Sequence, residues 1–164
     1  MMEKIAAVLI ASDSRSDGQR EDLTGPAAAA ALAGLGLGVL EMAVVPDEIA
    51  PLMSKMIKWS DNKKIALILT CGGTGLSPRD VTPEATLQIV ERAVPGIPQL
   101  LRTKSMEITP HGALSRGLAG IRNNTLIINL PGSPKAVKET IGFLEPILAH
   151  ALETVTGRAV ECGR

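Results

Sequence analysis

Aromatic residues are almost absent from this chain, which has one Trp, one Phe and no Tyr among its 164 residues. Proteins that bind single-stranded nucleic acid stack the bases on aromatic side chains, so that class of protein is disfavoured. An excess of either charge is missing as well, because 17 Lys and Arg balance 17 Asp and Glu. No overall field therefore draws the chain to nucleic acid or to an anionic membrane, and any anion site has to be local.

Cysteines and long hydrophobic runs are also scarce. Two cysteines, Cys71 and Cys162, are too few for a disulfide framework or a zinc cluster, which fits the reducing cytosol. Cys71 ends an apolar run, and this favours packing over a nucleophilic role. The first apolar run is short and ends in charge, unlike a signal peptide, and no segment approaches the ~18 apolar residues of a membrane span. We therefore expect a cytoplasmic protein that binds neither membrane nor nucleic acid.

Apolar runs alternate with helical patterns along most of the chain. The segments between the runs carry helix signals, such as Pro in a first turn, Gly at an end, and apolar residues three or four positions apart. This alternation predicts one α/β domain over residues 1–164, a three-layer α/β/α sandwich with a mostly parallel central sheet. The run at 65–71 is the most uniformly apolar and is expected at the centre of the sheet. The expected strands are 4–11, 39–45, 65–71 and 125–130.

Two of the four strand exits favour an anion. The third strand is followed by G-G-T-G, in which Gly72, Gly73 and Gly75 let backbone N–H groups approach an anion. Thr74 adds a hydroxyl group and Arg79 adds a bidentate fork. Taken alone, this glycine cluster is equally typical of a tight turn.

The fourth strand is followed by P-G-S-P-K. Ser133 is expected to cap a helix there, with Pro134 at its first position and Lys135 beside its N-terminus, where anions are favoured. Thr82 is expected to cap the helix that follows the glycine loop in the same way. Neither exit matches a Walker A loop or a dinucleotide-binding fingerprint, so the standard nucleotide folds are excluded.

Three carboxylates complicate an anion site. Asp13, Asp47 and Asp80 each lie just past a predicted strand, so all three are expected at one edge of the sheet. A carboxylate about 4 Å from a phosphate oxygen repels it by about 1 kcal/mol in water and about 4 kcal/mol at a protein surface. Mg2+ offsets this repulsion, because it is held by one or two carboxylates together with substrate phosphates. Polyphosphate chemistry is the inference.

Structural readings of the same aspartates stay open. Asp80 can pair with the neighbouring Arg79 or cap the helix after Thr82, and Asp47 can cap the helix after Pro46. The two histidines, His111 and His150, stand in no recognisable catalytic spacing with a Ser or Cys and receive no role.

The five loop motifs taken together resemble one known family. They are S-D-S after the first strand, P-D-E after the second, G-G-T-G-L-S-P-R-D-V-T-P-E-A-T after the third, T-P-H-G-A-L-S-R before the fourth, and L-P-G-S-P-K-A after it. This combination is similar to the molybdopterin adenylyltransferases of the MogA/MoaB type, and closest to the MogA type. The resemblance runs from about residue 5 to about residue 157.

The resemblance implies a compact α/β/α fold, a homotrimer and a nucleotidyltransferase of molybdenum cofactor biosynthesis. Such enzymes use Mg-ATP to adenylylate the terminal phosphate of molybdopterin and release pyrophosphate, and a molybdate-inserting enzyme is the implied transient partner. The family's catalytic and metal-binding aspartates fall on Asp47 and Asp80. Positions that hold substrate phosphate or nucleotide in the family fall on Gly72, Gly73, Thr74, Gly75, Ser115, Pro131, Gly132 and Ser133. Further substrate contacts are expected from Ser12, Asp13, Arg79 and Lys135 in the same strand-exit loops.

Two relatives of the same fold offer other readings. One is a MoaB-like trimer that binds or scaffolds the pterin without turning it over. The other is the competence-damage-type hydrolase domain, which is normally fused to more chain than the seven residues after Gly157. Release of pyrophosphate separates the enzyme from the binding protein.

Overall fold

Six strands form one sheet within residues 5–62 and 64–157, the part of the chain that the computed structural model describes. Their order is β2-β1-β3-β6-β5-β4, in which β2, β1, β3 and β6 are parallel and β5 runs antiparallel to both its neighbours. The predicted mostly parallel sheet is therefore confirmed. The strands are β1 (Ile5–Ala11), β2 (Gly38–Val45), β3 (Ile65–Cys71), β4 (Arg92–Ala93), β5 (Ala119–Arg122) and β6 (Thr125–Leu130).

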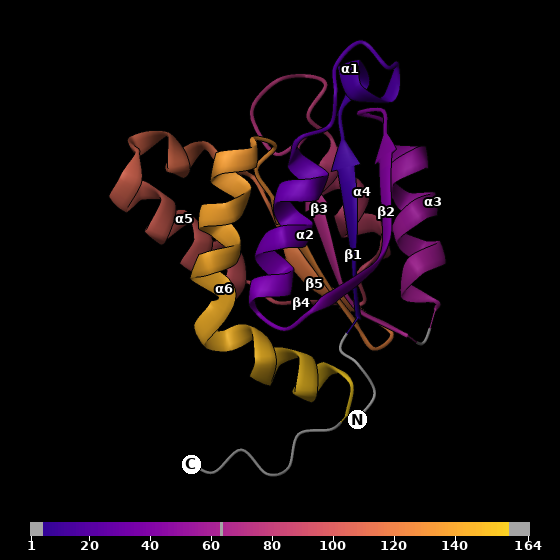
Figure 1. Cartoon of the computed structure of the whole chain (residues 1–164), viewed down its shortest axis with the longest axis vertical. Coiled ribbons are helices and arrows are strands. Elements are labelled where there is room, and N and C mark those ends of the chain that lie inside the picture. The colour runs from indigo at the N-terminus through magenta and orange to yellow at the C-terminus, as the bar shows by residue number, and fades with distance from the viewer. Residues whose placement is uncertain (1–4, 63, 158–164) are drawn as a thin grey trace.

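Helices cover both faces of the sheet and complete the three predicted layers (Figure 1). They are α1 (Asp13–Ser16), α2 (Thr24–Gly34), α3 (Ile49–Ser60), α4 (Thr82–Ile89), α5 (Gly96–Ile108) and α6 (Pro134–Val155), with a 3-10 helix, η1, at Pro110–Leu114. Helices α2, α5 and α6 pack on one face of the sheet, and α3 and α4 pack on the other. Among the described residues, no helix has both the length and the apolarity that crossing a bilayer requires.

The core is divided by the sheet into two apolar layers. Along β1, Val8 belongs to the layer under α2 and α6, whereas Leu9 belongs to the layer under α3 and α4. Successive side chains of a strand point to opposite faces, so a strand covered on both faces is apolar throughout. All seven residues of β3 are buried, and β3 lies between β1 and β6, as predicted for the most apolar run.

The order in which strands are added to the sheet changes direction between the neighbouring strands β1 and β3. The connection from β1 leads outward to β2, whereas the connection from β3 leads to strands on the other side of the sheet. In open parallel sheets, ligands bind outside the carboxyl ends of the strands at such a switch point. Figure 1 shows this end of β1 and β3 beneath α1 and the long loop before α4.

Strands β4 and β5 were missed by the sequence analysis because neither carries a buried apolar run. Strand β4 has two exposed residues, and β5 has four residues of which two are buried. Strand β5 pairs with β6 through a tight turn in which Asn123 has a φ of +51°. Asn is one of the few residues other than Gly that tolerates this conformation, so the Asn123–Asn124 pair was the available signal for a hairpin.

The predicted cap at Thr82 is wrong. Helix α4 already includes Thr82, and its N-cap residue is Val81, which makes no side-chain capping hydrogen bond. The Ser133 cap is confirmed, because its Oγ accepts a hydrogen bond of 3.1 Å from the backbone N–H of Ala136 at the start of α6. Gly157 ends that helix with a φ of +72°, as expected for a glycine after a C-terminus.

We expect Gly72→Ala to lower the free energy of unfolding by about 2 to 4 kcal/mol. Gly72 has a φ of +102°, and a Cβ there would lie 2.4 Å from the carbonyl oxygen of Ala11. Gly36→Ala is the matched control, since Gly36 has a φ of +75° with nothing within 4 Å of an added Cβ. Backbone conformation alone costs about 1 to 2 kcal/mol there. Urea unfolding measures both, and equal losses would contradict a role for the contact with β1.

Candidate functional site

Asp13 and Asp47 join the loops after β1 and β2. The backbone N–H of Asp13 donates to Oδ2 of Asp47 at 3.0 Å, and the backbone N–H of Asp47 donates to Oδ1 of Asp13 at 3.0 Å. Each carboxylate therefore accepts a hydrogen bond from the other residue's main chain. The expected meeting of these two aspartates at the carboxyl edge of the sheet is observed, and neither side chain caps α3, whose N-cap residue is Glu48.

Arg79 reaches back across the site to Asp13. Its Nε donates to Oδ2 of Asp13 at 3.0 Å and its Nη2 donates to Oδ1 at 2.9 Å, which makes a bidentate pair. The alternative pairing of Arg79 with its neighbour Asp80 is therefore wrong. Direct binding of phosphate by Arg79 stays a prediction. It requires the guanidinium group to leave Asp13, or to bind Asp13 and the phosphate at the same time.

Asp80 is held within its own loop. Its Oδ2 accepts a hydrogen bond of 2.9 Å from the backbone N–H of Ser77, and its backbone N–H donates to the carbonyl oxygen of Ser77 at 2.9 Å. It does not cap α4. The carboxylate of Asp80 is near enough to that of Asp47 for its charge to raise the pKa of Asp47, so all three aspartates share one edge of the sheet.

Opposite environments shift the pKa values of Asp47 and Asp13. Burial raises the pKa of Asp47 above its ordinary value, and the negative charges of Asp13 and Asp80 raise it further. The hydrogen bonds from Arg79 lower the pKa of Asp13, with help from the backbone N–H of Asp47. Arg79 thus compensates Asp13 directly, whereas at Asp47 its positive charge is outweighed by burial and by the neighbouring carboxylates.

The glycine loop presents backbone N–H groups that have no partner among the described residues. Gly72 donates to the carbonyl oxygen of Leu130 at 3.1 Å, but none of the hydrogen bonds among the described residues uses the N–H of Gly73, Thr74 or Gly75. Gly73 has a φ of +64°. Successive N–H groups in such turns form an anion-binding concavity, which favours the anion reading of G-G-T-G over a simple turn.

Gly73 lies between Asp47 and Thr82. A Cβ on Gly73 would lie 3.1 Å from Oδ1 of Asp47 and 2.4 Å from Oγ1 of Thr82. Thr82 is fully buried, and its hydroxyl has no hydrogen-bond partner within the part of the chain described. A buried hydroxyl without a partner is costly, and the site beneath the loop contains one that no other described residue satisfies.

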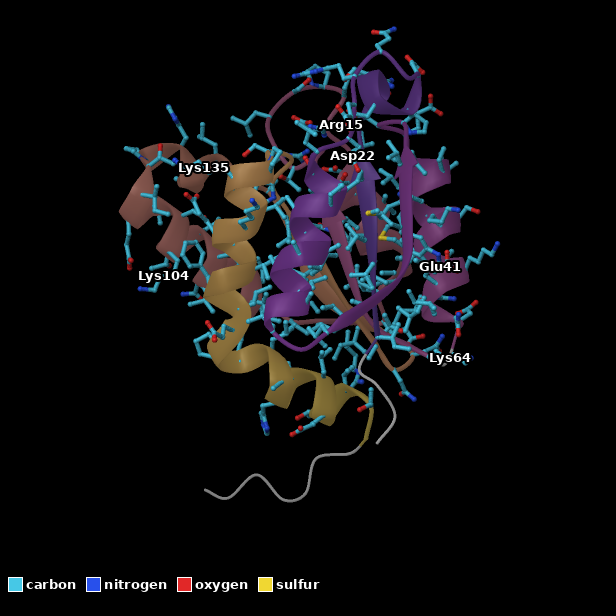
Figure 2. The ribbon with its side chains drawn as sticks, in the orientation of Figure 1. Arg15, Asp22, Glu41, Lys64, Lys104 and Lys135 are labelled. Carbon is cyan, nitrogen blue, oxygen red and sulfur yellow. The ribbon has the colours of Figure 1, made fainter. Side chains whose placement is uncertain are left out.

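The P-G-S-P loop packs against the glycine loop. A Cβ on Gly132 would lie 3.1 Å from Cα of Gly72, and the hydroxyl of Thr24 donates to the carbonyl oxygen of Gly132 at 2.8 Å. The N-terminus of α6 is thereby held at the same edge. Lys135 lies at this end of α6 with 84% of its side chain exposed and Nζ 3.8 Å from Glu139 (Figure 2).

Two charged residues that the sequence analysis passed over meet near the start of α2: Asp22, just before that helix, and Arg15 of α1. Asp22 accepts hydrogen bonds from the backbone N–H groups of Thr24 and Gly25, and Nε of Arg15 lies 4.0 Å from its Oδ1 (Figure 2). Beneath them, burial raises the pKa of the Cys71 thiol to about 12. Cys71 is fully buried in the apolar layer under α2 and α6, so the packing role predicted for it is confirmed.

A cleft of about 290 Å3 opens beside the glycine loop. It contains the predicted residues Thr74, Gly75, Ser115 and Pro131. Its other walls come from α5, η1, β6 and the first turns of α6, and no binding role was assigned to these residues, although residues 109–114 and Ala136 lie within motifs that carried the family resemblance. These walls are lined by Leu101, Arg102, Ser105, Ile108, Thr109, His111, Gly112, Leu114, Asn129, Ala136, Glu139 and Thr140.

The arrangement of carboxylates fits a magnesium ion. No hydrogen bond among the described residues reaches Oδ1 of Asp47 or Oδ1 of Asp80, while a backbone N–H fixes the other oxygen of each. Within the same residues there is no cluster of three or more His, Cys, Asp or Glu that could cage a metal. Two carboxylates with such oxygens, beside a loop whose N–H groups could receive an anion, are a donor set that fits Mg2+ when substrate completes its shell.

Comparison with known proteins identifies relatives along almost the whole chain. The model of a family described as probable molybdopterin binding domain matches residues 7–150. A molybdopterin adenylyltransferase of Helicobacter pylori is 39% identical over 156 residues, which are 94% of this chain and 89% of that protein. The structure of the molybdopterin biosynthesis enzyme MoaB from Thermus thermophilus has a TM-score of 0.89 at 44% identity, and the match covers 96% of this chain and 99% of that one.

Another relative is much longer than this chain. The molybdenum cofactor synthesis protein cinnamon of Drosophila melanogaster is 47% identical over 112 residues. That match covers 68% of this chain, but this chain spans 19% of cinnamon. The likeness therefore concerns one part of that protein.

We expect an NMR titration of the side-chain carboxyl carbons to give Asp47 a pKa above 3.8, the ordinary value for Asp. Asp80→Asn removes a negative neighbour and should lower this pKa, whereas Arg79→Met removes a positive one and should raise it. Shifts in the opposite directions would contradict the charge distribution described above.

The same shifts set the pH dependence of stability. Folded Asp47 binds its proton more tightly than the unfolded residue, so its contribution is present below pH 3.8 and is lost as pH rises through the folded pKa. Asp13 does the reverse: its contribution is present above pH 3.8 and is lost as pH falls through its lowered pKa.

Proposed function

The chain belongs to the family of probable molybdopterin-binding domains, and from this premise we propose that it is a molybdopterin adenylyltransferase of molybdenum cofactor biosynthesis. One observation carries the proposal. Within the described part of the chain, the N–H groups of Gly73 to Gly75 have no hydrogen-bond partner, and they share an edge of the sheet with Asp47 and Asp80, each of which has one carboxylate oxygen that accepts no hydrogen bond. A relative named for this activity supports it at 39% identity.

The reaction is the transfer of an adenylyl group between phosphates. An oxygen of the terminal phosphate of molybdopterin attacks the α-phosphorus of ATP and forms the new P–O bond. The bond between the α-phosphorus and the oxygen that bridges to the β-phosphate breaks, and pyrophosphate leaves with that electron pair. The attacking oxygen is already ionised at neutral pH, so no Ser or Cys nucleophile is required, in agreement with the buried and protonated Cys71.

Positioning and charge compensation are the tasks left to the protein. The backbone N–H groups of the glycine loop and the hydroxyl of Thr74 bind phosphate oxygens. The N-terminus of α6, capped by Ser133, offers further N–H groups at the same edge. We retain the substrate contacts predicted for Ser12, Asp13, Ser115 and Lys135. Asp13 also holds Arg79 in place.

Asp47 and Asp80 are the residues that would hold Mg2+. The ion supplies neutralisation of the phosphate charge that builds up during transfer. Asp47 has to be deprotonated to bind it, and its raised pKa means that the free site loses this carboxylate at a higher pH than an ordinary Asp would.

The cleft beside Thr74 and Ser115 is the proposed place of the organic part of a substrate. Its walls are mostly apolar, with Ser105, Thr109 and His111 among the polar groups. The two aromatic residues of the chain lie elsewhere, Trp59 in α3 and Phe143 in α6. Stacking on an aromatic ring is therefore not part of this proposal, and hydrogen bonds orient the ring system.

Several further properties are proposed with the activity. The 164 residues act as one domain and assemble as a homotrimer in the cytoplasm. The adenylylated product passes to a molybdate-inserting enzyme in a transient contact. Sequence resemblance supports these statements.

We expect Asp80→Asn and Asp47→Asn each to lower kcat for pyrophosphate release by about 10²-fold or more, because each removes charge from the proposed magnesium site. The assay mixes ATP, Mg2+ and molybdopterin and follows pyrophosphate together with the mass of the pterin. Asp61→Asn is the control, since Asp61 follows α3 at the opposite edge of the sheet and should have no effect.

The same assay separates the enzyme from a binding protein. Wild-type protein that retains molybdopterin on a column but releases no pyrophosphate would be the non-catalytic relative. Full Mg-dependent turnover by Asp80→Asn would remove Asp80 from the metal site.

We expect light scattering after gel filtration to give three times the chain mass of 17.1 kDa. Strand β2 is compatible with an interface, because it is an edge strand with Leu40 and Met42 about half exposed. A mass of one chain at micromolar concentration would contradict the trimer.

A further inference from the structure

Arg116 ties the glycine loop to the segment between η1 and β5. Its backbone N–H donates to the carbonyl oxygen of Thr74 at 2.9 Å, and its Nε donates to the carbonyl oxygen of Gly75 at 2.7 Å. Its Nη2 donates to the carbonyl oxygen of Asp80 at 2.6 Å. One side chain therefore holds both ends of the loop segment from Gly75 to Asp80.

Glu84 holds the other side of the guanidinium group. Nη1 of Arg116 donates to Oε1 of Glu84, in the first turn of α4, and Nη2 lies 3.5 Å from Oε2. These hydrogen bonds lower the pKa of Glu84. The planar guanidinium group is thus fixed by four acceptor oxygens, two carbonyl oxygens of the loop and the two carboxylate oxygens of Glu84 in α4.

Loop residues 76–79 are all exposed, and the side chain among them that reaches outside the loop is Arg79, which pairs with Asp13. The hydrogen bonds between Ser77 and Asp80 close the loop upon itself. The position of the Asp80 carboxylate relative to the sheet therefore depends on this exposed ion pair and on what anchors the two ends of the loop. Arg116 provides this anchor from a part of the chain that is distant in sequence.

Arg116 and its hydrogen bonds to the loop and to Glu84 form what we call the clamp. Ser115, the residue before Arg116, connects the clamp to the cleft. Its backbone is extended, with φ −69° and ψ 124°, so the side chains of consecutive residues diverge. Ser115 lines the cleft together with Thr74 and Gly75, while Arg116 reaches the loop. Arg116 therefore sets the distance between Ser115 on one wall of the cleft and Thr74 and Gly75 on the other, as well as the position of Asp80.

We propose that Arg116, oriented by Glu84, is the positioning residue of the site, fixing the Gly75–Asp80 loop against Ser115 in the geometry that adenylyl transfer requires. The inference rests on the proposed function for its effect on turnover. Arg116 acts through the loop, because its guanidinium group is occupied by protein oxygens, and this distinguishes it from a phosphate-binding arginine.

Arg116→Met should fold, because side chains 35% and 44% exposed form an ion pair of little worth to stability, and water can reach the released loop carbonyls. We expect kcat for pyrophosphate release to fall about 10²-fold, since misplacement by about 1 Å has such an effect, with the KM for ATP changed less than about threefold. Arg116→Lys should be nearly as slow, because an ammonium group cannot bridge both carbonyls and Glu84.

A second measurement does not depend on turnover. Hydrogen exchange at the backbone amides of Ser77 and Asp80, followed by NMR, should become at least about tenfold faster in Arg116→Met. Arg92→Met, at an exposed residue of β4, is the matched control and should change neither exchange nor kcat. Glu84→Gln should give a smaller effect, and the double variant Glu84→Gln with Arg116→Met should be no slower than Arg116→Met.

Unchanged exchange in Arg116→Met would overturn the inference, and so would faster exchange with wild-type kcat. Wild-type kcat in Arg116→Lys would also overturn it, because charge alone would then suffice. If the wild-type protein released no pyrophosphate, the proposed function would fail, and the exchange result would decide the clamp alone.

Discussion

Three strand ends meet at Gly72, where no side chain fits. Its N–H donates to the carbonyl oxygen of Leu130 at the end of β6, and an added Cβ would meet the carbonyl oxygen of Ala11 at the end of β1. Gly132 approaches Gly72 from the loop after β6. This close approach of backbones brings the exits of β1, β3 and β6 within reach of one ligand, and the rest of the site depends on it.

Charge is distributed unevenly over this edge of the sheet. Arg79 compensates Asp13 with a bidentate pair, so Asp13 organises the loops after β1 and β2 instead of repelling an anion. Among the described residues, Asp47 and Asp80 each keep one carboxylate oxygen that accepts no hydrogen bond. Burial raises the pKa of Asp47, and the negative charges of Asp13 and Asp80 add to this shift. A loop with free N–H groups beside two such carboxylates favours a ligand that brings its own cation, as the proposed substrate Mg-ATP does.

Local patterns in the sequence predicted the elements that depend on neighbouring residues. The apolar run at 65–71 indicated a central strand, and Ser133 followed by Pro134 indicated a helix start. The same reasoning failed where a tertiary contact decided the outcome. Thr82 has the residue type of a cap, but it lies inside α4 and against Gly73, so its hydroxyl has no partner among the described residues.

The sequence by itself determined the alternating order of strands and helices, the position of the four strand-exit loops, and the residue types in them, because periodicity and turn chemistry are local properties. Only the tertiary structure decided the partners: Asp13 for Arg79, and Glu84 with two loop carbonyls for Arg116. It also decided that α5 and η1 supply walls of the cleft. These pairings join residues 32 to 66 positions apart. Such residues come together only because the strands pair side by side in the sheet.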